Sequence, residues 1–106
     1  MVIYEVNISI PSTKKDEYIS WLEPHIEEML EFEGFENADM YEKNNIVAND
    51  DSDEVTQLVV QYHVSSENAL DNYINVQAKK MRADGTQKFP EQVINRRSLL
   101  RRKTYK

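Results

Sequence analysis

Residues 2–11 read VIYEVNISIP, and this stretch decides the fold that the sequence predicts. Apolar side chains occupy every second position from Val2 to Ile10, which is the pattern of a strand with one buried face. Pro11 has no amide hydrogen to donate to a neighbouring strand, so the strand should end there. We therefore expect a strand to open the chain, with even-numbered side chains in the core and odd-numbered side chains on the other face of a sheet.

Helical and strand patterns continue along the rest of the chain. They predict a helix that begins at a cap on Ser12 or Thr13 and ends near Glu33 before Gly34, a strand over 35–47, a polar hairpin loop over 49–53, a strand over 55–64, a helix that begins at a cap on Ser65 or Ser66 and ends at Gly85, and a strand from Val93 to about Arg102. This order is typical of an α+β, ferredoxin-like βαββαβ domain, with a four-stranded antiparallel sheet in the order 4-1-3-2 and two helices on one face. A chain of 106 residues has the length of one domain, so we expect a single domain over 1–106 that ends in a basic strand and tail at 96–106.

The chain contains no cysteine, which excludes disulfide bonds, thiolate metal sites and cysteine nucleophiles. It opens on the strand pattern, without a positively charged lead followed by an apolar run. No apolar stretch approaches the length that spans a membrane. We therefore expect a cytoplasmic protein with no membrane partner.

The net charge of −6 is unevenly distributed along the chain. Six basic residues and no acidic residue lie between Arg96 and Lys106, which leaves seven of the 13 lysines and arginines against all 19 acidic residues in the remainder. The tail could attract a polyanion, but the acidic body repels nucleic acid, so we do not expect nucleic-acid binding. The alternative is that the tail neutralises the acidic first helix of its own subunit or of a partner.

Several common functional sites lack the residues that they need. Two glycines, Gly34 and Gly85, cannot build a phosphate-binding loop or a dinucleotide fingerprint, and no Gly-x-Ser-x-Gly motif is present. His25 and His63 are the only imidazoles, and neither has a second ligand at metal-binding spacing on a helix. We expect neither a metal nor a cofactor.

Trp21 and His25 form the first candidate site, because residues four apart share one face of a helix. An indole ring beside an imidazole can hold a flat organic ligand, and a histidine can transfer a proton near neutral pH. His25 is therefore the candidate catalytic base. The alternative is that Trp21 packs in the core or in a dimer interface, as large aromatic residues most often do, while His25 binds a backbone carbonyl.

Polar side chains on the sheet face away from the helices form the second candidate. They are Glu5, Asn7, Gln57, Gln61 and His63, with Tyr41 and Arg97 as further members. These groups should converge, because the first and third strands are neighbours in the expected sheet. Ile3 and Val59 lie on the same face, and a bare mixed face leaves little core in so small a domain. We therefore expect a second subunit to cover this face in a homodimer, and the alternative is a face that is only hydrated.

Arg82, Asp84 and Gly85, with Phe89 downstream, form the third candidate. Arg82 could anchor a carboxylate or phosphate group of a ligand. In the structural alternative, Asp84 accepts bonds from amides in a turn, Gly85 takes the left-handed conformation that ends a helix, and Arg82 pairs with the acidic body. Helix ends routinely need such groups, so this second role is the commoner one.

Six segments of the sequence carry a resemblance to a known family. They are Val2-Ile3-Tyr4-Glu5-Val6, Trp21-x-x-x-His25-Ile26, Gly34-Phe35, Val60-Gln61-Tyr62, Arg82-Ala83-Asp84-Gly85 with Phe89, and Arg97-Ser98-Leu99-Leu100. Together they resemble an uncharacterised bacterial domain-of-unknown-function family of about this length. The resemblance implies a ferredoxin-like, dimeric α+β-barrel fold, similar to cofactor-independent monooxygenases, haem-degrading enzymes and muconolactone-isomerase-like proteins, and it implies no particular activity. The ending Arg101-Arg102-Lys103 departs from the family's pattern.

Three functions remain open, because this fold hosts many unrelated activities. The first is a homodimer that binds a small organic molecule in a pocket between the sheet and the helices. Its candidate ligand-binding residues are Trp21, Tyr4, Tyr62, Gln61, His63 and Arg82. The second is an enzyme similar to cofactor-independent monooxygenases or isomerases, with His25 as the base or, as a weaker candidate, His63. The third is an interaction module whose basic tail binds an acidic partner or nucleic acid.

Overall fold

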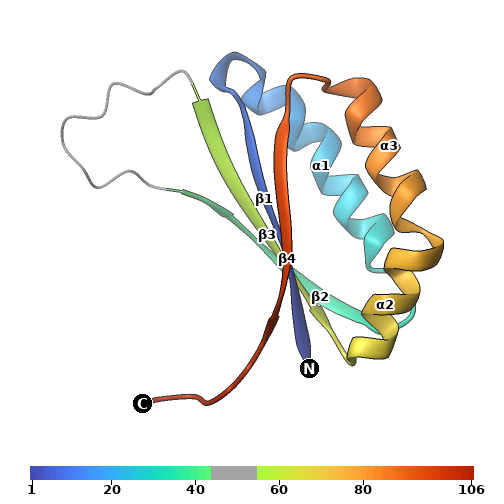
Figure 1. The fold of residues 1–106 in the computed structure, drawn as a ribbon. Helices are drawn as coiled ribbons and strands as arrows, with labels where there is room; N and C mark the ends of the chain where they lie inside the picture. Colours follow the sequence, from blue (N-terminus) through green and yellow to red (C-terminus); the bar gives the residue numbers. More distant parts are fainter. Residues whose placement is uncertain (44–54) are drawn as a thin grey trace.

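Four strands form one antiparallel sheet in the order β2-β3-β1-β4, which confirms the predicted order 4-1-3-2 (Figure 1). The computed structural model describes residues 1–43 and 55–106. The strands are β1 (Val2–Pro11), β2 (Phe35–Glu42), β3 (Val55–Val64) and β4 (Val93–Leu100). The predicted loop over 49–53, and the predicted end of the second strand at Val47, lie outside the described residues.

The central strand β1 fixes which side chains face the core. It pairs with β3 from Val2 opposite Val64 to Pro11 opposite Val55, and with β4 on its other side. Because successive side chains of a strand alternate between faces, this register places the even-numbered residues of β1 and β3 on one face. Four of those residues on β1 (Val2, Tyr4, Ile8 and Ile10) are at most 3% exposed. The period-two pattern of residues 2–11 therefore predicted the buried face of the sheet.

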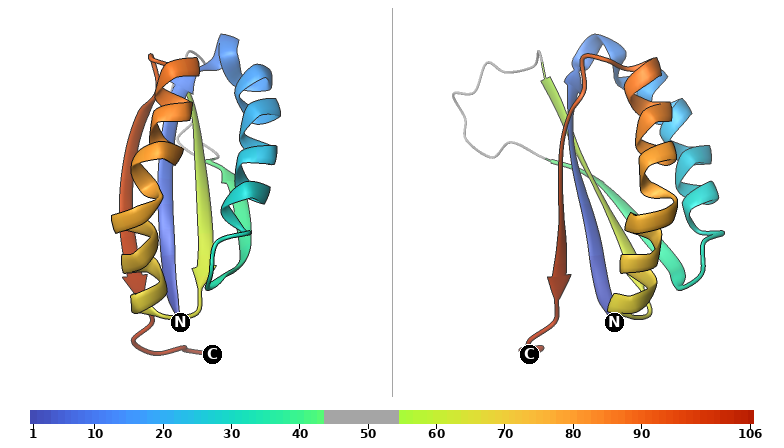
Figure 2. Two further views of the ribbon diagram at one scale, coloured as in Figure 1. Left: turned by 90° about the vertical axis from the view of Figure 1, so that its right-hand side faces the viewer. Right: turned by 45° about the vertical axis from the view of Figure 1, so that its right-hand side comes forward.

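All the helices lie on that face of the sheet, as the views in Figure 2 show. A short 3-10 turn (Ser12–Lys14) leads into α1 (Lys15–Met29), and α2 (Glu67–Val76) and α3 (Ala78–Lys88) connect β3 to β4. In the left view of Figure 2, α1 covers the β3 side of the sheet, α2 and α3 cover the β4 side, and β1 is visible between them. This arrangement leaves the opposite face of the sheet without a covering layer among the described residues.

The first α-helix begins later and ends earlier than its sequence pattern predicts. Neither predicted cap accepts a bond from a helical amide, because the Ser12 hydroxyl lies 2.8 Å from the Thr56 hydroxyl on β3 instead. The helix ends at Met29, and turns lead from there to Gly34. Gly34 has a φ of +86°, the left-handed conformation expected of it, and turns the chain into β2.

The second predicted helix is divided in two. The Ser66 hydroxyl accepts a bond from the Ala69 amide at 3.1 Å and caps α2, as predicted. The helical path then breaks at Gln77, and α3 continues to Lys88, so the prediction that the helix ends at Gly85 was wrong. A Cβ at Gly85 would lie only 3.0 Å from the Trp21 ring, so this glycine allows α3 to approach α1 closely.

The C-terminal tail leaves the sheet after Leu100, two residues before the predicted end of the strand. Residues 101–106 are exposed and extend away from the helices (Figure 1). No ion pair joins them to α1 in the part of the chain that the structure describes. Within the same ranges, no helix has the length and apolar character needed to cross a membrane.

Candidate functional site

A cavity of about 40 Å³ lies between the sheet and the helices. It is lined by five of the seven residues predicted to act in catalysis or ligand binding, namely Tyr4, Trp21, His25, Tyr62 and Arg82. The structure thus brings together residues from β1, α1, β3 and α3 that are far apart in the sequence. Because a cavity needs only ~10–15 Å³ to hold a water molecule, this one is large enough for a few waters or a small chemical group.

Trp21 and His25 form one wall of the cavity. Their rings stack with centroids 4.6 Å apart and an interplanar angle of 23°, as their spacing on α1 allows. The Trp21 ring also lies 5.6 Å from the Tyr18 ring and 5.9 Å from the Phe89 ring, and Tyr18 and Phe89 are fully buried. Trp21 therefore packs in the core and also lines the cavity. The interpretation as a packing residue and the interpretation as a ligand-binding residue are compatible.

The His25 side chain is half-buried and forms no hydrogen bond with another side chain in residues 1–43 and 55–106. Burial lowers its pKa from the ordinary value of 6.5, and the nearby carboxylates of Glu28 and Asp84 only partly oppose this effect. The imidazole is therefore neutral at pH 7. A neutral imidazole without a competing partner can accept a proton from a molecule in the cavity.

Tyrosines form the inner surface of the cavity. The Tyr4 ring stacks on Tyr62 with centroids 6.0 Å apart and lies 5.8 Å from Tyr73. Burial raises the pKa of Tyr62 and Tyr73 well above the ordinary value of 10, so their hydroxyls stay neutral and can donate hydrogen bonds. The cavity therefore offers flat apolar surfaces together with neutral donors.

Two arginines complete the lining. Arg82 on α3 donates a hydrogen bond from Nη2 to the Tyr4 hydroxyl at 3.2 Å, while its Nε is buried without a partner among the described residues. Arg96 on β4 also lines the cavity, and burial lowers its pKa. Sequence reasoning assigned Arg96 only to the basic tail. The alternation of β4 could have found it, because Arg96 pairs with Val6 and shares the helix-covered face with Ile94.

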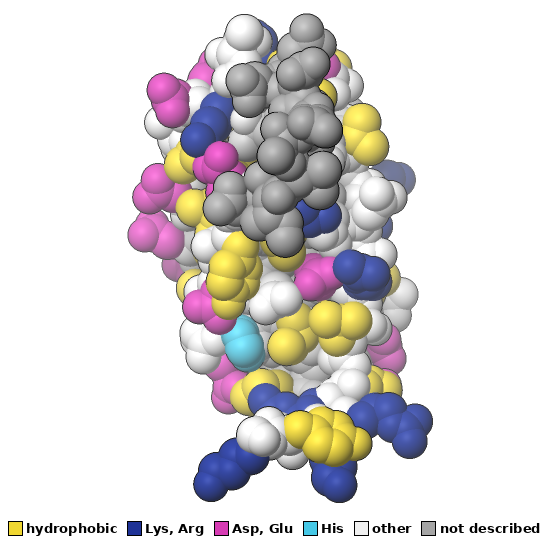
Figure 3. All heavy atoms as spheres, turned by 90° about the vertical axis from the view of Figure 1, so that its left-hand side faces the viewer, with side chains coloured by type: hydrophobic (Ala, Val, Ile, Leu, Met, Phe, Trp, Pro, Cys, Tyr) yellow, Lys and Arg dark blue, Asp and Glu magenta, His cyan; other side chains and the backbone are white. Residues whose placement is uncertain are grey.

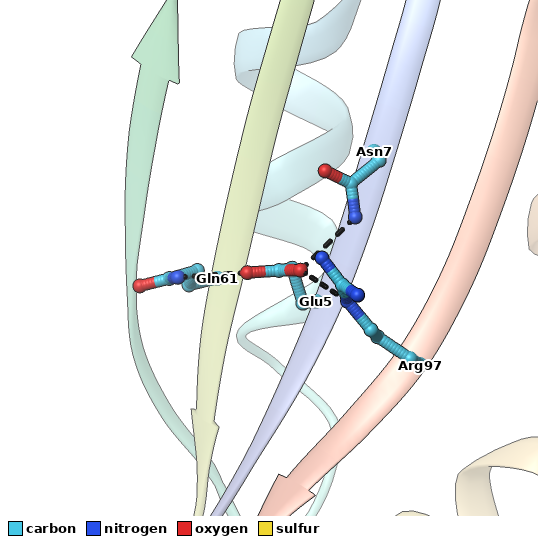
Figure 4. A network of polar contacts seen from close by, with 4 residues as sticks. All are labelled: Glu5, Asn7, Gln61 and Arg97. Carbon is cyan, nitrogen blue, oxygen red and sulfur yellow. Dashed lines mark hydrogen bonds and ion pairs between the residues drawn. The ribbon is translucent and has the colours of Figure 1, made fainter. Parts of the chain in front are cut away.

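The polar groups of the second candidate converge on the other face of the sheet (Figure 4). The carboxylate of Glu5 accepts hydrogen bonds from Arg97 Nε at 2.6 Å, Gln61 Nε2 at 2.9 Å and Asn7 Nδ2 at 3.0 Å. The bonds from Gln61, Asn7 and Arg97 lower the Glu5 pKa to about 2. Glu5 is only 6% exposed, so these partners satisfy a covered charge.

Gln61 and His63, predicted as ligand-binding residues, also lie on this face, so they do not line the cavity beside Trp21. His63 Nε2 lies 3.1 Å from an Asp39 carboxylate oxygen on β2, and Gln61 is held by Glu5. Figure 3 shows hydrophobic side chains among the charged ones on this face. Its exposed apolar residues include Tyr41, Val55, Val93 and Leu99.

In the part of the chain that the structure describes, no group of three or more histidine and acidic side chains is arranged to hold a metal ion. The cavity lining likewise offers no acidic ligand for a metal ion among the described residues. Its ionisable residues are His25, two arginines and tyrosines, and it contains no carboxylate among the described residues. Such a lining suits an organic molecule or an anion better than a hard cation, which prefers oxygen ligands.

Comparison with known proteins relates the chain to solved structures through its fold. It is similar to a candidate antibiotic biosynthesis monooxygenase from Deinococcus radiodurans, with 11% identity, a TM-score of 0.72 and coverage of 100% of this chain and 97% of that chain. A dimeric ferredoxin-like protein from an uncultured marine organism has 13% identity, a TM-score of 0.70 and coverage of 98% of both chains. A cofactor-independent oxygenase from Streptomyces nogalater has 12% identity, a TM-score of 0.65 and coverage of 97% of this chain and 95% of that chain. The structural similarity establishes the ferredoxin-like fold, and the low sequence identities leave the activity open.

The curated proteins contain no match to the sequence. One family model, described as a domain of unknown function (DUF4286), matches residues 1–103 and thus nearly the whole chain. The resemblance that the sequence suggested is therefore confirmed, and the chain belongs to this family, DUF4286, whose function is unknown.

Proposed function

We propose that the protein is a homodimer that binds a small organic molecule in the cavity between its sheet and its helices. The observation that supports this most directly is the cavity itself, which lies beside Trp21 and His25 and has an aromatic lining. Binding pockets for small molecules commonly combine apolar and aromatic walls with a few polar groups that orient the ligand. Here Arg82 and the Tyr4 hydroxyl supply such groups.

The size of the cavity restricts what can bind. Its volume of about 40 Å³ is well below the ~300–1,000 Å³ of pockets for drug-sized ligands. The ligand is therefore small, or the half-buried Trp21 and His25 rings move outward when it enters. Both cases predict that the chemical environment of these two rings changes on binding.

A nuclear magnetic resonance titration tests this function. Small aromatic and aliphatic compounds are added to the ¹⁵N-labelled protein, and the binding function predicts shifts at the Trp21 indole and at the Gly85 amide. The variant Val6→Phe places a larger side chain on the lining and should abolish these shifts. Val76→Phe is the matched control, because Val76 is 64% exposed at the end of α2. Shifts confined to the other face of the sheet would contradict the proposal.

An enzymatic function is the second candidate, and the state of His25 favours it. A neutral, half-buried imidazole without another side-chain partner in the described residues is suited to remove a proton from a bound substrate. In an isomerase the same proton returns to a different carbon, so the composition of the substrate is unchanged. The Streptomyces nogalater protein of similar fold is a cofactor-independent oxygenase. For such a reaction here, dioxygen is the co-reactant: a CH₂ group of the substrate supplies the electrons and both hydrogens, one oxygen atom becomes the carbonyl oxygen of the product and the other leaves as water.

Two measurements test the enzymatic function with any compound that binds. Deuterium incorporation from D₂O reports proton removal, and an oxygen electrode reports oxygenation. His25→Gln should stop the reaction without preventing binding. His63→Gln is the matched control, because His63 lies on the other face beside Asp39. Equal rates in the wild type and in His25→Gln would exclude His25 as the base.

The homodimer is supported by the uncovered face of the sheet. Exposed apolar residues, including Tyr41, Val55 and Leu99, share that face with a Glu5 carboxylate that is already satisfied within the subunit. A second copy could bury the apolar side chains without leaving this charge unpaired. Leu99→Lys should therefore convert the dimer to a monomer in light scattering coupled to size-exclusion chromatography, while Val76→Lys on the helical side should not. A wild type that is monomeric at all concentrations would exclude the dimer.

The role of the basic tail as an interaction site stays a prediction. The cytoplasmic location also stays a prediction. Arg96 lines the cavity and Arg97 binds Glu5, so the basic residues of the tail that remain for an external partner are Arg101, Arg102, Lys103 and Lys106. Removal of residues 101–106 should weaken binding of an acidic polypeptide, and raised salt should do the same. Binding that is insensitive to both would exclude this function.

A further inference from the structure

Two positively charged side chains reach the cavity from different layers of the fold. Arg82 comes from α3 in the helical layer, and Arg96 comes from β4 in the sheet. Burial is the main cause that lowers the Arg96 pKa, and the Arg82 guanidinium lowers it further, so the two charges are near enough to repel. Half-buried like charges destabilise a fold unless an opposite charge compensates them.

No carboxylate among the described residues compensates the charges of Arg82 and Arg96. Neither arginine forms an ion pair within residues 1–43 and 55–106. Arg82 Nη2 bonds only to the neutral Tyr4 hydroxyl, and its Nε is buried without any partner there. Asp84 and Glu28 are exposed, and they affect His25 without pairing with either arginine.

The next residue of β4 shows how differently a paired arginine is placed. Arg97 points to the other face of the sheet, where its Nε donates to Glu5 at 2.6 Å. Arg97 is 65% exposed on the side chain and has a carboxylate partner, whereas Arg96 is more buried and has none among the described residues. Arg82 and Arg96 are therefore half-buried arginines without a carboxylate partner among the described residues, whereas Arg97 has one.

A planar anion would supply the missing charge and the missing acceptors. A carboxylate has two oxygens that match the two parallel donors of a guanidinium, and arginine binds it more strongly than a neutral acceptor. The remainder of a small acid would lie against the stacked rings of Tyr4 and Tyr62 or against Trp21. We propose that the cavity is specific for a small organic acid, whose carboxylate is held between Arg82 and Arg96. This inference rests on the proposed binding function and names its class of ligand.

Matched pairs of acids and amides test the charge requirement. Benzoate is compared with benzamide, and acetate with acetamide, by titration of the full-length protein in a buffer of low chloride content. The acid and the amide of each pair have nearly the same shape, so the comparison isolates the charge. We expect the acids to bind at least about tenfold more tightly, as for a hydrogen bond that gains a charged partner. Inorganic phosphate is the third probe, and tighter binding of phosphate than of both acids would overturn the assignment of a carboxylate.

Variants of the two arginines identify the residues that recognise the charge. Arg96→Met and Arg82→Gln should each weaken benzoate binding about tenfold or more, with little effect on benzamide. Arg101→Gln in the exposed tail removes the same charge and should change neither affinity. Without ligand, Arg96→Met should have an unchanged or higher melting temperature, because it removes an uncompensated charge from a half-buried position. A purely structural Arg96 would give the opposite result, namely a lower melting temperature and equal losses for the acid and the amide.

The outcomes separate this inference from the proposed function. Equal binding of the acid and the amide, with shifts at the Trp21 indole, would overturn the preference for acids and leave the binding function intact. The absence of binding by either compound, together with unchanged Trp21 signals, would contradict both. Tight binding of benzoate that survives both arginine substitutions would place the acid elsewhere and overturn the inference.

Discussion

The substitution Gly34→Ala tests the turn that carries the chain from α1 into β2. The φ of +86° at Gly34 costs a residue with a Cβ about 1–2 kcal/mol. The added Cβ would also lie 2.4 Å from the Ala69 Cβ on α2, where carbon atoms in contact are normally ~3.5–4.0 Å apart. Because the Ala69 Cβ cannot rotate away, the backbone must shift, at a cost of about 1–3 kcal/mol.

The expected loss is therefore about 3 kcal/mol of unfolding free energy, after allowance for the ~0.4–1 kcal/mol by which alanine restricts the unfolded chain. For a domain of this size, such a loss lowers the melting temperature by roughly 10–20 °C. Urea denaturation followed by circular dichroism measures the free energy directly. A free energy of unfolding within about 0.5 kcal/mol of the wild type would refute the reasoning.

A double-mutant cycle separates the two causes. Ala69→Gly removes the contacted Cβ and costs about 1 kcal/mol of helix propensity by itself. In the double variant the collision is gone but the positive φ remains. Its loss of unfolding free energy should therefore be smaller than the sum of the two single losses by about 1 kcal/mol or more. Gly85→Ala is the comparison without a positive φ: Gly85 lies within α3, and its added Cβ would lie 3.0 Å from the Trp21 ring and 3.3 Å from Gln92 Nε2. We expect a smaller loss than for Gly34→Ala, because the closest approach is less severe and alanine favours the helix. Additive losses for Gly34→Ala and Ala69→Gly would show that the collision does not occur.

Three further predictions concern the sheet face, a helix cap and the tail. The Glu5 pKa of about 2 lies below its ordinary value of 4.5, so its stabilisation is present above pH 4.5 and is lost as the pH falls toward 2. Glu5→Gln should therefore be less stable than the wild type at pH 7 by urea denaturation, with a difference that shrinks between pH 4.5 and 2; a constant difference would contradict this. Ser66→Ala removes the cap of α2 and should cost about 1 kcal/mol in the same assay, against less than about 0.5 kcal/mol for the exposed Ser98→Ala. Truncation after Leu100 should leave thermal stability unchanged within 2–3 °C, since residues 101–106 are exposed, and a larger decrease would mean that the tail packs on the fold.

The strands were predictable because burial on one face imposes a period of two, and that period is visible in residues 2–11 and 55–64. The helix ends were less predictable, because a cap is used only where tertiary contacts leave it free. Ser12 has the chemistry of a cap, yet its hydroxyl bonds to Thr56 across the turn. Gly85 has the chemistry of a helix end, yet it lies inside α3 where the Trp21 ring needs space.

The site was predictable in part for the same reason. Trp21 and His25 could be paired from their spacing, because a helix places residues four apart on one face. Tyr4 and Tyr62 followed from the alternation of their strands. Arg96 was not identified, because a run of basic residues at a chain end resembles a solvated tail, although the alternation of β4 relative to Arg97 already implied its face.

The order of periodic segments in the sequence determined the strands, the sheet order and the face that carries the helices, since each of these follows from which side chains avoid water. Only the tertiary structure decided which side chains on each face of that sheet come into contact. The register of β4 sends Arg96 into the cavity and Arg97 to Glu5, and the packing of α3 on Trp21 defines the wall of the site. Such pairings depend on distances between segments that are remote in the chain, and local patterns carry no information on those distances.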